Sequence, residues 1–145
     1  MIVRSVLKNK PSFEVATTIA SQTVGEVAKL LDEKRIGALV VVDDKKNLAG
    51  ILSERDIVRG MSRHGAKVYD LKVGDLMTKD VLTCGMDDTI DTLMKTMTSK
   101  RIRHLPVMEN GKLAGVMSIG DVVKAQLEEA ALQVDSLRDY VMAGH

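Results

Sequence analysis

The sequence predicts an α+β fold made of two copies of one small unit. Three observations predict it: an internal repeat, the same order of strand-type and helix-type patterns in each copy, and the composition of a globular protein. The chain has 145 residues, of which 45% are hydrophobic and 28% charged. These values are ordinary for a folded domain of this length. We expect a sandwich in which helices cover one face of a sheet.

The repeat has an offset of 66 residues in its first part and 65 in its second. Residues 23–41 contain seven identities at the first offset: Thr23, Lys29, Lys34, Arg35, Ile36, Leu39 and Val41 recur as Thr89, Lys95, Lys100, Arg101, Ile102, Leu105 and Val107. Residues 48–58 contain six more at the second offset: Leu48, Ala49, Gly50, Ser53, Asp56 and Val58 recur as Leu113, Ala114, Gly115, Ser118, Asp121 and Val123. A loop tolerates the loss of one residue and a strand does not. We expect the two copies to pack against each other about a pseudo-two-fold axis.

Each copy predicts the order β-α-β-β-α. Apolar residues at i, i+3, i+4 and i+7 predict an amphipathic helix beginning at Val24 and another at Ile90. Asn110-Gly111 predicts a tight hairpin, whose counterpart is the longer loop 43–47. The predicted strands are 14–17, 38–42 and a strand ending at Ser53 in the first copy, and 81–84, 105–108 and 113–117 in the second. The last helix of each copy runs through 56–61 or from Asp121 onward.

The end of the chain departs from the repeat. Residues 121–142 contain no Gly or Pro, and apolar residues follow a 3–4 spacing at Leu127, Ala130, Val134, Leu137 and Val141. A helix of this length is about 30 Å long. It either folds back on the core or forms a dimer contact. We divide the chain into repeat 1 with an N-terminal helix (1–66), repeat 2 (67–125) and a helical tail (126–145).

Composition argues against several classes of function. The net charge is +1 and there are only three aromatic residues, so nucleic-acid binding is not expected. The longest aliphatic run covers residues 38–42, far short of a membrane span, and residues 1–10 lack the apolar stretch of a secretory signal. A single cysteine fits a reducing compartment. We expect a cytoplasmic protein.

The most informative motif is Ser-x-x-Asp after a Gly-containing strand, at Ser53 to Asp56 and again at Ser118 to Asp121. One interpretation is a capping box at the start of a helix. The other is a ligand site, because free N–H groups and the helix dipole favour a phosphate and a carboxylate accepts hydrogen bonds from a ribose diol. The duplication favours ligand binding.

A second cluster, Arg103-His104 before a strand containing Pro106, supplies cationic donors. It is either a phosphate contact or a solvated loop. The Pro indicates an edge strand or a cleft. Because Gly37 and Ala38 replace the basic pair in the first copy, we expect two clefts of different charge.

Catalytic and metal-binding motifs are not found. The three His and one Cys lack metal-ligand spacing, and no nucleophile elbow or glycine-rich phosphate loop is present. We therefore expect a protein that is not an enzyme, with no catalytic cofactor and no metal.

The duplicated motifs, with Arg-His-Leu-Pro-Val at 103–107, resemble a tandem pair of cystathionine β-synthase (CBS) domains, or Bateman module, from about Ser5 to Val123. The resemblance implies a stand-alone regulator that binds adenosine ligands between its repeats. AMP, ADP, ATP and NAD(H) are expected, with S-adenosylmethionine less favoured. It also implies a homodimer. The composition and the short aliphatic runs predict that neither nucleic acid nor a membrane is a partner.

The resemblance further implies two binding sites, each combining one repeat's Ser-x-x-Asp segment with strands of the other. Site 1 comprises Ala16, Gly37, Ala38, Ser118, Ile119, Gly120 and Asp121. Site 2 comprises Ser53, Glu54, Arg55, Asp56, Leu82, Arg103 and His104. The Asp would hold the ribose, and the Ser with the helix N-terminus would hold the phosphate. The alternative is an interaction module with vestigial clefts.

Overall fold

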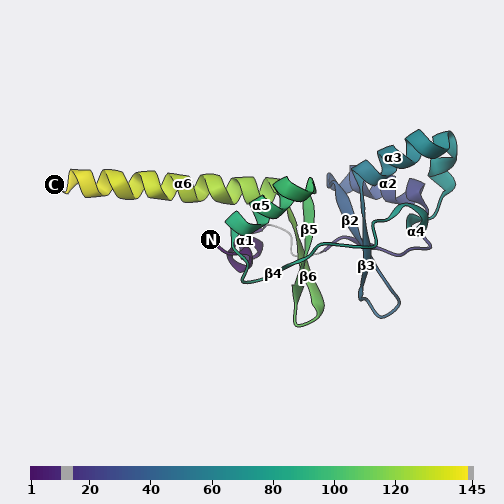
Figure 1. Cartoon of the computed structure of the whole chain (residues 1–145), viewed down its shortest axis with the longest axis horizontal. Coiled ribbons are helices and arrows are strands. Elements are labelled where there is room, and N and C mark those ends of the chain that lie inside the picture. The colour runs from purple at the N-terminus through teal and green to yellow at the C-terminus, as the bar shows by residue number, and fades with distance from the viewer. Residues whose placement is uncertain (11–14, 144–145) are drawn as a thin grey trace.

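The structure is a computed structural model that describes residues 1–10 and 15–143. It contains two three-stranded sheets, with strand orders β1-β2-β3 and β4-β5-β6 (Figure 1). The first repeat comprises β1 (Thr17–Thr18), α2 (Val24–Lys34), β2 (Ala38–Val42), β3 (Leu48–Ser53) and α3 (Glu54–His64). The second comprises β4 (Cys84–Gly85), α5 (Ile90–Lys100), β5 (His104–Glu109), β6 (Lys112–Ser118) and α6 (Ile119–Met142). The predicted α+β class and the β-α-β-β-α order are confirmed.

Local backbone geometry repeats as closely as the sequence does. Arg35 follows helix α2 and Arg101 follows α5 as C-cap residues, both in the left-handed region with φ of 53° and 54°. Strands β2 and β5 each carry a register shift at equivalent positions, after Val41 and after Val107. The two repeats are therefore duplicated in their irregular positions as well as in their regular elements.

The two hairpins differ as the offset predicts. Asn110 and Gly111 both have positive φ, which a two-residue turn between twisted strands requires. The corresponding connection between β2 and β3 is residues 43–47, where the Asp43 carboxylate accepts hydrogen bonds from the N–H groups of Lys45 and Asn47. The longer loop is thus closed by its own side chain.

The predicted first strands are wrong in extent. Of residues 14–17, Glu14 lies outside the described residues, Val15 and Ala16 are not in a strand, and β1 is Thr17–Thr18. Of residues 81–84, only Cys84 belongs to a strand. These segments each contact one neighbouring strand over two residues, which is too short to show a hydrophobic pattern.

Of the two expectations for Pro106, an edge strand or a cleft, the edge strand is wrong, because β5 is the middle strand of its sheet. The segment that enters β5 does line a cavity between the repeats. In the first repeat the equivalent residue, Val40, donates its N–H to the carbonyl oxygen of Ala16 at 3.3 Å. Pro106 has no N–H to donate. Pairing of β4 with β5 accordingly begins one residue later, at Val107. The proline shortens the ladder at the end that faces a cleft.

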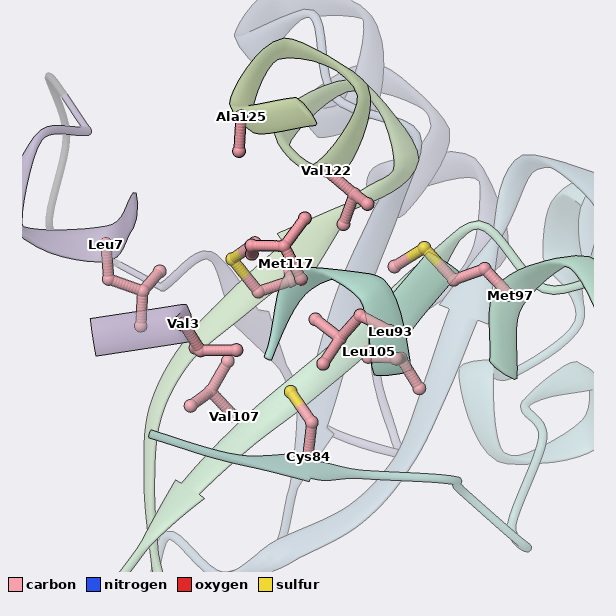
Figure 2. Packing of buried hydrophobic residues seen from close by; sticks show 11 residues of the cluster. Val3, Leu7, Cys84, Leu93, Met97, Leu105, Val107, Met117, Val122 and Ala125 are labelled. Carbon is pink, nitrogen blue, oxygen red and sulfur yellow. The ribbon is translucent and has the colours of Figure 1, made fainter. Parts of the chain in front are cut away.

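Each sheet has its own hydrophobic core. The core of the first repeat contains Val27, Leu31, Leu39, Val41, Leu52 and Val73. The core of the second, shown in Figure 2, includes Leu93, Met97, Leu105, Val107, Met117 and Val122. Helix α1 (Val3–Lys8) contributes Val3 and Leu7 to this second core, although its place in the sequence groups it with the first repeat. The N-terminal segment therefore crosses from one repeat to the other.

Between the repeats lie two elements that the sequence patterns did not predict: the 3-10 helix η1 (Gly65–Asp70) and the short helix α4 (Val73–Leu76). Val73 of α4 is buried in the first core. The N–H of Val73 donates to the carbonyl oxygen of Gln22, at 2.8 Å. The segment that contains α4 therefore packs on the first repeat and completes its core.

Helix α6 projects away from both sheets (Figure 1). Its first turns pack on the second core through Val122 and Ala125. Beyond them it exposes large apolar side chains: Leu127, Leu132, Val134, Leu137, Tyr140, Val141 and Met142. The predicted long helix is confirmed, and the alternative in which it folds back on its own core is wrong.

Candidate functional site

Two cavities lie where the repeats meet, and each takes residues from both. The larger, of about 550 Å³, is named here the Asp56 cavity. It is lined by the start of α3, by Thr78 and residues 80–82, and by the segment leading into β5. Its volume lies within the range of small-molecule sites. All seven residues of predicted site 2 line it: Ser53, Glu54, Arg55, Asp56, Leu82, Arg103 and His104.

The second cavity, of about 380 Å³, is named the Asp121 cavity. It lies between the start of α6, the strand β6, the segment leading into β2 and the N-terminal residues Leu7 and Lys10. Five residues of predicted site 1 line it: Ala16, Gly37, Ala38, Ser118 and Asp121. Ile119 and Gly120 are not among its lining residues, and Ile119 packs against the second core.

The Ser-x-x-Asp segments form capping boxes in both repeats. The hydroxyl of Ser53 accepts a hydrogen bond from the N–H of Asp56 at 3.3 Å, and the Asp56 carboxylate accepts one from the N–H of Ser53 at 2.9 Å. Ser118 and Asp121 repeat the arrangement at 3.1 and 2.8 Å. The capping interpretation is therefore confirmed, and any ligand role adds to it. The two boxes fix the helix N-termini at the cavity walls.

The two aspartates differ in their remaining contacts. Oδ1 of Asp56 lies 3.4 Å from the hydroxyl of Thr78 and 3.8 Å from the guanidinium of Arg59. Oδ2 of Asp121 forms an ion pair with Nζ of Lys10, at a distance of 2.9 Å. The Asp56 side chain is 8% exposed and that of Asp121 18%. Asp121 is thus the more accessible carboxylate but has the closer cation.

Residues that the motifs did not indicate also line the cavities. Lys10 and Arg35 bring two cations to the Asp121 cavity, where none was expected beside Gly37 and Ala38. Four arginines and three carboxylates line the Asp56 cavity, so each lining carries a formal charge of +1 when His104 is neutral. The cavities therefore differ in the number of charged groups and not in net charge. The recurrence of Arg35 as Arg101 was the available signal, whereas Lys10 lies outside the repeat.

One hydrogen-bond donor of Arg55 is already used within the protein. Its guanidinium donates a hydrogen bond to the carbonyl oxygen of Arg101 at 3.0 Å. This contact joins the start of α3 to the segment that precedes β5. Arg55 therefore lines the Asp56 cavity and at the same time links two of its lining segments.

His104 stands first in β5, opposite Ser118 of β6. Burial lowers the pKa of its imidazole below the usual value of 6.5, opposed by the carboxylates of Glu54 and Asp121. The ring is therefore neutral at pH 7. His104 and Gly37 are the two described residues that line both cavities.

The CBS domain family model matches residues 3–63 and 73–128, which cover both repeats. The chain belongs to the CBS domain family. The crystal structure of the CBS-domain containing protein ATU1752 from Agrobacterium tumefaciens superposes with a TM-score of 0.83 at 43% identity, covering 86% of this chain and 92% of that one.

Two further relatives extend the CBS comparison. The chain is 36% identical over 127 residues to the mitochondrial CBS domain-containing protein CBSX3 of Arabidopsis thaliana, covering 85% of this chain and 62% of that protein, less than two thirds of its length. The CBS domain pair of protein MJ0100, solved in complex with 5′-methylthioadenosine and S-adenosyl-L-methionine, has a TM-score of 0.76 at 23% identity, covering 86% of this chain and 98% of that one.

Within residues 1–10 and 15–143 of this CBS pair, no helix combines the length and apolarity that crossing a membrane needs. The same residues bring together no group of three or more His, Cys, Asp or Glu side chains able to hold a metal ion.

Proposed function

We propose that this CBS pair is a non-enzymatic regulatory protein that binds adenosine-containing nucleotides, among them AMP, ADP, ATP and NAD(H), in the Asp56 and Asp121 cavities. The observation that carries the proposal is the equivalence of the two cavities. Each combines a Ser-x-x-Asp helix start from one repeat with the strand entry of the other. If the Ser-x-x-Asp segments served only to cap helices, neither would need to lie beside a cavity.

Each part of a nucleotide has a matching group. The positive dipole ends at the starts of α3 and α6 and the adjacent cations favour a phosphate. The carboxylates of Asp56 and Asp121 would accept hydrogen bonds from the ribose hydroxyls, replacing the long contacts of Asp56 to Thr78 and Arg59 in one cavity. The apolar side chains of Ile51, Val58 and Leu82 would face the base in the Asp56 cavity. The ligands bound by the MJ0100 pair also contain adenosine, which supports this ligand class.

A sensor of this kind acts by differential binding. A ligand that contacts both repeats favours the arrangement in which its contacts to both are made, and disfavours others. A partner or a second copy would respond to that arrangement. The exposed apolar face of α6 supports a homodimer as the assembled form. Cytoplasmic location stays a prediction from the single cysteine.

A nucleotide panel tests the function. Thermal unfolding is measured with AMP, ADP, ATP, NAD(H) and S-adenosylmethionine, and we expect at least one to raise the melting temperature by several degrees at saturation. If none does, the cavities are vestigial and the alternative, an interaction module, is correct. Analysis of the nucleotides after incubation shows them unchanged if the protein is not an enzyme.

A further inference from the structure

His104 and Gly37 form the partition between the two cavities. Both residues line both cavities, and they come from different repeats. A Cβ placed on Gly37 would lie 3.0 Å from Cε1 of His104 and 2.6 Å from Oε1 of Glu54. The imidazole thus fills the space that a side chain at position 37 would need. One titratable ring therefore faces two ligand sites.

Charged groups reach this ring from each side. Glu54 at the start of α3 belongs to the Asp56 cavity, and Asp121 on α6 and Lys10 after α1 belong to the other. Arg103 precedes His104 on its own segment. The equivalent of His104 in the first repeat is Ala38, so the second repeat alone supplies such a group. Only the second repeat contributes a titratable group between the cavities, so protonation of His104 changes the charge beside both of them.

We propose that His104 couples the two cavities, because a phosphate bound in either one favours the protonated imidazole, and the imidazolium then favours an anion in the other. This coupling rests on the proposed nucleotide binding. It makes the protein sensitive to pH and to the joint occupancy of both sites.

The sign of the effect follows from linkage. Burial lowers the pKa of His104 in the free protein, so the neutral ring predominates above pH 6.5. An anion bound beside the ring favours its protonated form. For each pKa unit that a phosphate adds, the protonated protein binds that phosphate about tenfold more tightly. Coupling between sites is reciprocal, so either site can be filled first. Direct repulsion between two phosphates acts at every pH, whereas the His104 contribution acts only where the ring titrates.

The pKa of His104 measured by NMR tests the first step. The ring signal is assigned by its loss in His104→Gln, and the exposed His64, which lines neither cavity, serves as the internal control. With saturating AMP we expect the pKa of His104 to rise by about one unit, while the ring signal of His64 should not move when AMP is added. Binding of two AMP molecules with no change in the pKa of His104 overturns the proposal.

Calorimetric titration with AMP at pH 6.5 and 8.5 tests the second step. The ratio of second-site to first-site affinity should be three- to tenfold higher at pH 6.5 in the wild type, with no such difference in His104→Gln. Ionisation of AMP itself affects both proteins alike. Equal pH dependence in the two proteins overturns the coupling and leaves nucleotide binding intact. If AMP does not bind, the titration is made with the nucleotide that stabilises the protein best; absence of binding by every nucleotide of the panel overturns the proposed function, and the coupling with it.

Discussion

Asp56 and Asp121 each serve a helix cap, and the proposed ribose contact must be separated from that role. Loss of a cap costs about 0.5–2 kcal/mol with or without ligand. Loss of two ribose hydrogen bonds, each contributing about 1.5–3 kcal/mol, weakens binding roughly a hundredfold or more. We expect Asp56→Ala and Asp121→Ala each to lose the stabilisation given by a ligand in its own cavity, measured by thermal unfolding with and without AMP.

A matched control exists in α4. Asp75 accepts a hydrogen bond from the N–H of Lys72 at 3.0 Å in a similar cap, and it lines neither cavity. Asp75→Ala should lower stability yet keep the full ligand-induced shift, about 2.7 kcal/mol per site at 100 times Kd. The ribose role is refuted if Asp56→Ala and Asp121→Ala keep that shift as well.

We expect Arg103 to give the Asp56 cavity a preference for ligands with more phosphate. It is one of four arginines in that lining. Each charge-assisted hydrogen bond to a phosphate contributes about 1.5–3 kcal/mol, so Arg103→Ala should weaken ATP binding there roughly tenfold or more and AMP binding less. Calorimetry measures the affinities for ATP and AMP at two salt concentrations, because an electrostatic preference for ATP should fall with added salt. The exposed Arg63→Ala is the control. Unchanged selectivity in Arg103→Ala would show that the preference has another source.

Cys84 is predicted to be chemically inert in the folded protein. It is buried in the second core, and burial raises the pKa of its thiol to about 12. Because the thiolate is the reactive form, a disulfide reagent at pH 8 should modify the native protein far more slowly than the denatured one. Equal rates in the two states would contradict the burial of this side chain.

Helix α6 exposes a row of large apolar side chains that a second copy of the chain could cover. Leu127 and Leu137 are 67% and 65% exposed, so replacing them should change the stability of a monomer little. If α6 forms the dimer contact, Leu127→Glu with Leu137→Glu should shift the sedimenting species from dimer to monomer at micromolar concentration. Glu128→Gln with Asp135→Asn, polar positions outside the apolar stripe, is the control. A wild-type protein that sediments as a monomer refutes the homodimer.

Elements were predictable from sequence where a pattern has enough length to show. The stripes of α2 and α5 and the turn at Asn110-Gly111 are local signals, and the structure confirms them. Strands β1 and β4 have two residues each, so the parallel ladder that defines them depends on tertiary contact. Pro106 led to the wrong prediction of an edge strand. Its missing N–H shortens the ladder between β4 and β5, but β5 still pairs on both sides.

The cavity lining was predictable to the extent that the repeat carries it. Site 2, which the resemblance to tandem CBS domains implied, lies together in full. Lys10 could not be found in this way, because α1 packs on the second core although it precedes the first repeat. Its ion pair with Asp121 depends on that crossing of the chain.

At the scale of the whole molecule, the duplicated fold predicts two ligand sites per chain, and calorimetric stoichiometry tests this most directly. Titration with the nucleotide that stabilises the protein best should give two equivalents for the wild type. Asp56→Ala and Asp121→Ala should each give one equivalent, and the double variant none. A wild type that binds no nucleotide, or single variants that still bind two equivalents, would contradict nucleotide binding in the Asp56 and Asp121 cavities.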